Sequence, residues 1–262
     1  MHLLAHRCWL RLALVLTTLC LLLVAGPAEA QEVVPSLGEA IEQTVAASPD
    51  EATDASVRLV LMLTALSLLP GLLLAMTPFT RFVIVFSLLR QALGLQQSPP
   101  NQILVGLSLA LSMLVMQPTL QEVWDDGVSP YMDGQTTSLQ AYEASIRPMR
   151  RFMLRNVGRD DLATAMRLSR MPRPKTLDEV PTPVVVTGFV LSELRTAFVI
   201  AVKIYVPFLV VDLVVASTLL GMGMMMLPPV VISLPFKLIF FVLVDGWYLV
   251  AGSLVRSFVP VT

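Results

Sequence analysis

The residue types that most often perform acid–base or metal chemistry are confined to one end of this chain. Its two histidines, His2 and His6, and its two cysteines, Cys8 and Cys20, all precede residue 31. If that stretch is removed, the remaining chain has no imidazole base, no disulfide and no histidine or cysteine ligands for zinc or haem. Carboxylate or serine chemistry remains possible. We therefore expect a protein that is not an enzyme and that needs no cofactor or metal.

The N-terminus has the three parts of a secretory signal. Arg7 and Arg11 flank the start of the apolar run "LALVLTTLCLLLVAG", which is followed by Gly26-Pro27 and then by Ala28-Glu29-Ala30. A charged region, an apolar region and a small-residue cleavage site in this order are typical of a signal peptide. We expect residues 1–30 to be a cleavable signal peptide, with a first transmembrane anchor as the alternative. Residues 31–56 are polar and small, and we expect a flexible exported N-terminal segment.

The composition is that of a membrane protein. The chain has 262 residues, of which 55% are hydrophobic and 14% charged, and its mean hydropathy is +0.75. Soluble domains carry about 25% charged residues. The net charge of -1 gives no indication of nucleic-acid binding. We predict an all-α, membrane-associated fold of helical hairpins with kinked or broken helices.

Residues 57–116 form the first apolar helical region. Pro70-Gly71 lies inside its first stretch, where we expect a kink. Arg81 and Arg90 are the only charges of the next stretch, and "QQSPPNQ" interrupts the chain after it. The last apolar run, Ile103 to Met116, is shorter than the roughly 20 residues of a full span. We expect it to end at Gln117-Pro118, and a re-entrant path is an alternative.

Residues 117–183 are much more polar. They contain nine basic and nine acidic side chains. The stretch "LQAYEASIRPMRRFMLRNVGRDDLATAMRLSR" predicts two amphipathic helices that are broken near Asn156-Val157-Gly158. We interpret this region as a charged, water-exposed helical module. An exported N-terminus and two crossings would place it on the periplasmic side and Arg81 and Arg90 in an inside loop, as the positive-inside rule prefers.

Residues 184–262 form a second apolar helical region that contains charges and helix breakers. A charge at the bilayer centre costs about 2.5–3.5 kcal/mol on insertion scales. We therefore expect these segments to pack against other subunits or a pore, although a position at a helix end is the alternative for each charge. We hypothesise that Glu193 pairs with Lys237, within one subunit or between subunits, and that Asp245 lies at a helix end. The predicted buried charges or subunit contacts are Glu193, Lys203, Asp212, Lys237 and Asp245.

Four methionines are concentrated in the short stretch "GMGMMMLPP", Gly221 to Pro229. Methionine is apolar, unbranched and conformationally adaptable. Gly221 and Gly223 permit tight turns, and Pro228 and Pro229 stop a helix. Taken alone, the stretch is consistent with methionines that fill gaps in an apolar core.

Several long stretches closely resemble the FliP family of the flagellar type III export apparatus. They are "MTPFTRFVIVFSLLRQALG", "PPNQILVGLSLALSMLVMQP", "SELRTAFVIAVKIYVPFLVVDLVVASTLLGMGMMMLPP" and "LPFKLIFFVLVDGWYLVAGSL". The similarity covers about residues 57–258. Injectisome export proteins share the same core, but the cleavable signal, "PPNQ" and "LPFKL" favour the flagellar branch.

The resemblance implies a structural pore component of the flagellar export gate. Such a protein passes unfolded flagellar subunits across the bacterial inner membrane at the flagellar basal body. It implies a homopentamer that forms a helical ring complex with FliQ- and FliR-like subunits. The expected neighbours are FlhA- and FlhB-like proteins and membrane lipids, and no nucleic acid is expected to bind. It also implies a methionine gasket across the pore, here Met224, Met225 and Met226 with Met222 just upstream. "GMGMMM" departs slightly from the family's more usual "ALGMMM".

Three other functions compete with the export gate. An injectisome-type gate subunit is the nearest alternative. A secondary transporter suits intramembrane charges and broken helices, but it predicts two similar halves, and the sequence shows none. An intramembrane hydrolase would need a base to activate serines such as Ser192 or Ser217, and residues 31–262 contain no histidine.

Overall fold

The computed structural model describes residues 49–96, 98–170, 176–224 and 227–258. The predicted signal peptide and most of the predicted flexible segment therefore lie outside the described residues. The chain divides into two compact units, Met1–Leu68 and Leu69–Thr262. Within the described ranges the regular elements are helical, as the fold-class prediction states. They are α3 (Pro49–Ala75), α4 (Phe79–Ala92), α5 (Asn101–Val123), the π-helical turn η1 (Trp124–Val128), α6 (Ser129–Met132), α7 (Ser138–Asn156), α8 (Arg159–Leu168), the 3-10 turn η2 (Leu177–Glu179), α9 (Thr182–Gly221), α10 (Pro229–Leu243) and α11 (Gly246–Arg256).

Helix α3 begins in the first unit. Residues 49–56 are already helical, so the helix starts before the expected boundary at residue 57. The helix also continues through Pro70, where the sequence predicts a kink, and ends at Ala75. Leu61, Met62 and Leu66 are exposed on it. An apolar helix with this much exposed surface is suited to lipid or to another protein.

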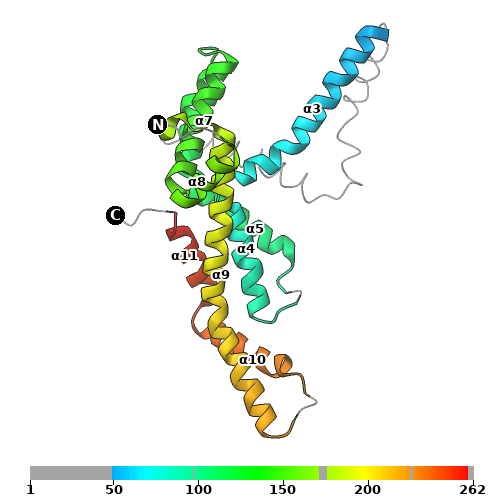
Figure 1. The fold of residues 1–262 in the computed structure, drawn as a ribbon, viewed down its shortest axis with the longest axis vertical. Helices are drawn as coiled ribbons and strands as arrows, with labels where there is room; N and C mark the ends of the chain where they lie inside the picture. Colours follow the sequence, from blue (N-terminus) through cyan, green and yellow to red (C-terminus); the bar gives the residue numbers. More distant parts are fainter. Residues whose placement is uncertain (1–48, 97, 171–175, 225–226, 259–262) are drawn as a thin grey trace. The chain divides into compact units, whose positions relative to one another are not determined.

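Helix α9 is the central element of the second unit. Helices α4, α7, α8 and α10 all pack against it (Figure 1). Its buried side chains include Phe189, Ala197, Ala201 and Phe208, which follow the helical period. Gly188 lies so close to Leu162 of α8 that an added Cβ would be 3.2 Å from the Leu162 Cα. Small residues on α9 thus allow neighbouring helices to approach its backbone.

The two amphipathic helices predicted in the charged region are confirmed as α7 and α8. Thr137 and Gln140 form a reciprocal capping box at the start of α7. Helix α8 starts after Gly158 and carries Asp160 and Asp161 in its first turn, where carboxylates are favoured by the helix dipole. The chain is extended at Val157 and Gly158 between them. The predicted break near Asn156-Val157-Gly158 is therefore at the observed position.

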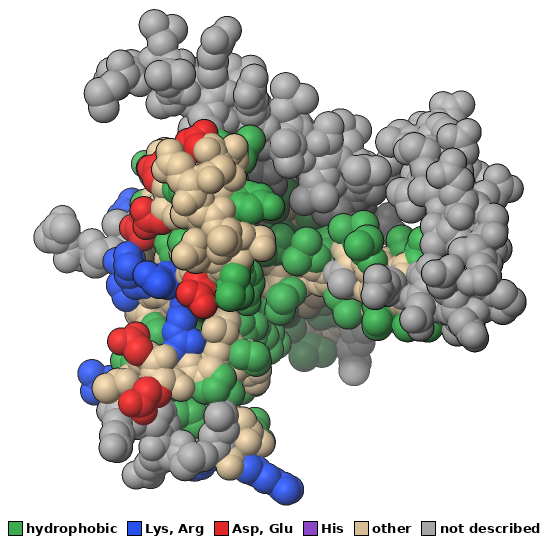
Figure 2. Space-filling model, turned by 90° about the horizontal axis from the view of Figure 1, so that it is seen from above, with side chains coloured by type: hydrophobic (Ala, Val, Ile, Leu, Met, Phe, Trp, Pro, Cys, Tyr) green, Lys and Arg blue, Asp and Glu red, His purple; other side chains and the backbone are tan. Residues whose placement is uncertain are grey.

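Charged side chains of both signs are interspersed on the end of the second unit that carries α7. Figure 2 looks onto this end and shows blue and red side chains next to one another. Arg151 donates to Glu122 at 2.9 Å, and both side chains are largely exposed. Such exposed pairs contribute about 0–1 kcal/mol each. These charges form a solvated, balanced surface.

Two helices of the apolar segments continue through a proline. Helix α5 continues through Pro118 instead of ending there, and with η1 and α6 it forms a candidate membrane span of 32 residues, Asn101–Met132. Helix α9 continues through Lys203 and Pro207 for 40 residues. Proline in a helix removes one backbone hydrogen bond, but prolines are tolerated in long apolar helices because local adjustments and neighbouring groups satisfy the freed backbone carbonyl.

Two described helices are long and apolar enough to cross a membrane, Asn101–Met132 and Thr182–Gly221. The number rises to as many as four if each of two bent helix pairs is one span. In one of these pairs, α10 and α11 meet at an angle of 61°. At 1.5 Å per residue, α9 is about 60 Å long, whereas the hydrocarbon core of a bilayer is about 30 Å thick. Part of α9 must therefore extend beyond the lipid tails.

Candidate functional site

The methionine-rich segment forms the turn between α9 and α10. Helix α9 ends at Gly221, and Gly223 follows with a left-handed φ of 75°. The Gly223 N–H donates to the Leu220 carbonyl and the Met224 N–H to the Leu219 carbonyl, both at 3.0 Å. These two bonds are the Schellman arrangement, in which a glycine ends a helix. Gly223 is thus required by the backbone of the turn.

The far side of the turn is set by two prolines. Pro228 is the N-cap of α10, and Pro229 is its first residue. Proline suits this position because the first turn of a helix has no partner for its backbone N–H groups. Of the predicted gasket, Met222 is 58% exposed and Met224 is 47% exposed. Met225 and Met226 lie outside the described residues.

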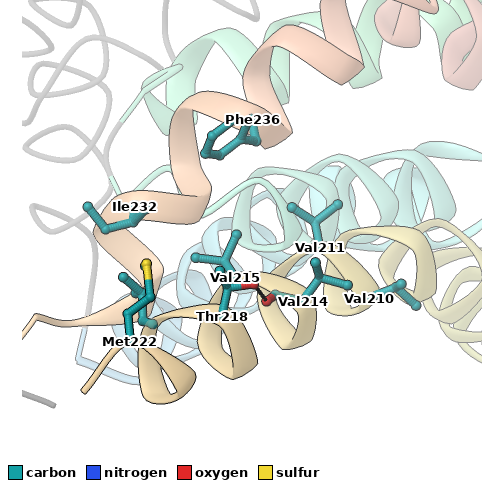
Figure 3. A pocket seen from close by; sticks show the side chains of 9 residues that line it. Val210, Val211, Val214, Val215, Thr218, Met222, Ile232 and Phe236 are labelled. Atoms are coloured by element: carbon teal, nitrogen blue, oxygen red, sulfur yellow. Dashed lines mark hydrogen bonds between the residues drawn. The ribbon is translucent and has the colours of Figure 1, made fainter. Parts of the chain in front are cut away.

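An apolar groove of about 490 Å³ lies beside this turn, between α9 and α10. Figure 3 shows Ile232 and Phe236 of α10 across the groove from α9 and Met222. Thr218 is the one hydroxyl in the lining, and it donates to the Val214 carbonyl at 2.8 Å. Binding sites for small polar molecules normally include a few directed polar groups. The described lining has none to offer, so the groove gives no support to a transporter site.

A buried ion pair joins α4 to α9. The Arg81 Nε donates to Glu193 Oε2 at 2.7 Å, and Arg81 Nη2 donates to Glu193 Oε1 at 2.6 Å. Glu193 is completely buried, and Arg81 is nearly so. A bidentate guanidinium–carboxylate pair fixes geometry as well as compensating charge. This contact fixes the register of the two helices relative to one another.

Two residues at the C-terminal end of the described chain also contact Arg81. Arg81 Nη1 donates to Ser257 Oγ at 2.8 Å, and the guanidinium carbon lies 3.8 Å from the centroid of the Phe258 ring. The same ring packs edge-on to Phe82 at 5.7 Å and stacks on Phe152 at 6.1 Å. A desolvated cation over an aromatic face gains about 2 kcal/mol or more. Arg81 of α4 thus contacts α9 and the end of α11 directly, and the Phe258 ring links it to Phe152 of α7.

A second ion pair joins α9 to α10. The Lys237 Nζ donates to Asp212 Oδ2 at 2.6 Å and to the Ala92 carbonyl at 3.1 Å. The Ser233 Oγ donates to the other Asp212 oxygen at 2.5 Å. Lys237 is buried, whereas the Asp212 side chain is 29% exposed. The Ala92 carbonyl is at the end of α4, so this network connects three helices.

The structure changes several of the predicted assignments. The hypothesised pair of Glu193 with Lys237 is wrong within the chain, because the two side chains bind Arg81 and Asp212 instead. Lys203 and Asp245 are exposed in the single chain, so their predicted burial is wrong there, and their role as subunit contacts stays a prediction. Asp245 does lie at a helix end, as predicted, because it precedes the first residue of α11.

Sequence reasoning missed the partners of these charges. Arg81 was expected in an inside loop, but it is a buried residue of α4. Its position among apolar residues was the available signal, since an isolated charge in such a stretch needs a partner. Ser257, Phe258 and Ser233 gave no comparable signal.

The serines considered for hydrolysis have other roles. Ser192 is buried, and its Oγ accepts a hydrogen bond from the Gly158 N–H at 2.9 Å. Ser217 donates to the Val214 carbonyl on an exposed part of α9. Among the described residues, no group of three or more His, Cys, Asp or Glu side chains could hold a metal ion.

Long apolar helices, joined by buried ion pairs and ending in an exposed methionine turn, define a helical integral membrane protein. Residues 62–254 match the sequence family described as the FliP family. The flagellar biosynthetic protein FliP of Caulobacter vibrioides is 54% identical over 206 residues, which are 79% of this chain and 77% of that protein. The FliP proteins of Pectobacterium carotovorum (50% identical; 78% and 79% covered) and Bacillus subtilis (47% identical; 80% and 96% covered) are similar to it as well.

This chain belongs to the FliP family. It is a non-enzymatic component of the flagellar export apparatus, located in the inner membrane at the flagellar basal body. The resemblance proposed from the sequence is therefore confirmed, and so is the flagellar assignment over the injectisome alternative. The ring assembly and the methionine gasket stay predictions.

Proposed function

We propose that this chain is a pore subunit of the flagellar export gate and that its methionine turn seals the pore. The observation that carries the proposal is the exposure of Met222 and Met224 at the end of the α9–α10 hairpin. Methionines that merely filled gaps in a core would be buried in the chain that contains them. The turn instead presents adaptable apolar side chains outward.

A protein-export pore has to block ions at rest and admit varied side chains when open. A ring of apolar side chains disfavours a continuous column of water, and hydrophobic constrictions close channels by dewetting. Methionine also has three rotatable bonds and a polarizable sulfur, so it can repack around an irregular substrate. The fixed helix ends on both sides of the turn hold the flexible side chains in one place.

The proposal requires several copies around an axis, a homopentamer in the family's assembly. The apolar window of α9 is only 11% buried within the chain. That surface supports assembly with further copies, with FliQ- and FliR-like subunits and with lipid. In this arrangement the FlhA- and FlhB-like proteins are neighbours, unfolded flagellar subunits are the substrate, and the charged α7–α8 region is on the periplasmic side.

The decisive experiment replaces Met224, Met225 and Met226 together with alanine. In the assembled complex, this triple variant should increase ion leak across the inner membrane and slow growth, because alanine leaves the constriction wider. The matched controls are Met62→Ala and Met132→Ala, which truncate exposed methionines far from the turn in the sequence. Neither control should change the leak. An assembled triple variant that leaks no more than the controls rules out the seal.

A further inference from the structure

Most charges in the apolar C-terminal region have a partner within the chain. Glu193, Asp212 and Lys237 are in the buried networks, and Arg195 lies 3.5 Å from Asp161 of α8. Among the residues that the structure describes from 182 onward, three charged side chains have no ion-pair partner. They are Lys203, Asp245 and Arg256.

Arg256 differs from the other two because it ends a helix. It lies in the last turn of α11, where a cation is favoured by the helix dipole. Lys203 has no such position, since it lies near the middle of the 40-residue helix α9. Asp245 makes no side-chain capping bond to α11. One unpaired cation and one unpaired anion therefore remain in apolar surroundings.

Lys203 lies beside a row of exposed apolar side chains, which we call the α9 stripe. Its members are 48–69% exposed and are spaced by three or four residues, so they share one face of the helix. They are Val199, Val202, Val206, Val210 and Leu213. A stripe of this kind, wide and mostly valine, is suited to close packing against another apolar surface.

Asp245 lies in a second apolar patch, the α10–α11 corner. Its members are 55–79% exposed and surround the junction of the two helices in sequence: Val242, Leu243, Tyr248 and Leu249. Asp245 itself has a left-handed φ of 53°. Glycine or asparagine adopts that conformation more readily than most residues. The backbone therefore does not require an aspartate at this corner.

The two charges lie at similar levels along α9 but on different sides of it. The Phe208 ring of α9 is 6.3 Å from Phe241, which is 5.5 Å from Trp247 of α11, so the corner lies near Phe208. Lys203 precedes Phe208 by five residues, which is a rise of about 7.5 Å and a rotation of about 140° around the helix. Lys203 therefore faces away from the helix that carries the corner.

We propose that Lys203 of one copy forms an ion pair with Asp245 of the next copy, with the α9 stripe of the first packed on the α10–α11 corner of the second. This proposal rests on the pore function above and names the contact that assembles it. A contact between two different patches is head-to-tail, and it closes into a ring when the rotation allows. Similar levels for the two charges are what a ring with its axis along α9 requires. Pairing also lowers the cost of burying the two charges in an apolar interface, compared with burying each one alone.

Cysteine cross-linking tests the head-to-tail geometry directly. The full chain, with its only cysteines Cys8 and Cys20 changed to serine, would carry either Lys203→Cys or Asp245→Cys. Oxidation of membranes that contain both single variants should give a cross-linked dimer. Membranes with either variant alone should give none. A chain with both substitutions should give a ladder of oligomers up to the size of the ring. Dimers of Lys203→Cys alone, or a cross-link within one chain, would overturn the proposal.

Charge exchange provides the second test, read as the amount of ring-sized complex in detergent. Lys203→Glu should reduce it, and Lys203→Glu combined with Asp245→Lys should recover it. Asp245→Asn removes the charge but keeps a residue that tolerates the left-handed backbone at this corner. It should therefore reduce ring formation without unfolding the chain. If rings persist in all variants and no cross-link forms, the inference fails while the pore function stands. If the unmodified chain forms no oligomer, the pore function fails as well.

Discussion

Arg81 and Glu193 are 112 residues apart in sequence, yet their side chains meet in two charge-assisted hydrogen bonds inside the protein. Removing one member of a buried ion pair leaves the other charge without compensation, which costs about 3–5 kcal/mol. Replacing both members with apolar residues of similar volume is often nearly neutral. Comparing single with double variants therefore separates the cost of an uncompensated buried charge from the net contribution of the pair to stability.

We expect Glu193→Gln to lower the thermal stability of the chain strongly and the double variant Arg81→Met/Glu193→Met to recover much of the loss. Thermal unfolding in detergent would measure both. Arg151→Ala is the matched control, because it breaks an exposed pair that contributes about 0–1 kcal/mol. Equal stability of Glu193→Gln and Arg151→Ala would show that the buried pair does not matter.

The pair of Asp212 with Lys237 should respond asymmetrically to mutation. Asp212→Ala leaves a buried ammonium group with one carbonyl partner, whereas Lys237→Met leaves a carboxylate that is 29% exposed and still bonded to Ser233. We expect Asp212→Ala to be the more destabilising change, by up to about 3–5 kcal/mol. The double variant should be more stable than Asp212→Ala alone. A double-mutant cycle by thermal unfolding measures the coupling, and additive effects would contradict it.

Phe258 is expected to contribute more to the stability of the fold than its position near the chain end suggests. Its ring contacts Arg81, Phe82 and Phe152. Truncation of a buried phenylalanine to alanine costs about 3–5 kcal/mol. Ser257→Ala removes a single hydrogen bond to Arg81, and a bond to a charged group contributes about 1.5–3 kcal/mol. Unfolding measurements should therefore rank Phe258→Ala below Ser257→Ala in stability, and the reverse order would argue against the aromatic cluster.

Replacing each of two nearby glycines with alanine should affect the stability of the fold differently. Gly223→Ala forces a side chain into the left-handed conformation, at a cost of about 1–2 kcal/mol. Gly221 is in helical conformation, and an added Cβ there has no atom within 4 Å, so Gly221→Ala should be neutral or stabilising by up to about 1 kcal/mol. Comparing the thermal unfolding of the two variants tests whether the turn requires a glycine at position 223. Gly223→Asn should be tolerated better than Gly223→Ala.

The sequence predicted local features of this fold better than its long-range contacts. The break between α7 and α8 was predictable because two amphipathic patterns are separated by a short stretch that contains Gly158. The continuity of α9 through Pro207 was not predictable, because proline opposes a helix locally and the surroundings that let a long apolar helix continue through it cannot be read from the sequence. The partner of Glu193 depends on how α4 packs against α9, and no sequence pattern predicts that packing. The turn geometry at Gly223 was indicated by its glycine, but the exposure of Met222 and Met224 was not.

The unbroken course of α9 gives the protein a mechanical property. One end of this helix packs against the charged helix α8, and the other ends at the methionine turn about 60 Å away at 1.5 Å per residue. Pro207 is the single interior position along it that lacks a backbone donor. A single continuous helix therefore connects the α8 contact to the methionine turn, and Pro207 is the position along it where a bend would break the fewest backbone hydrogen bonds.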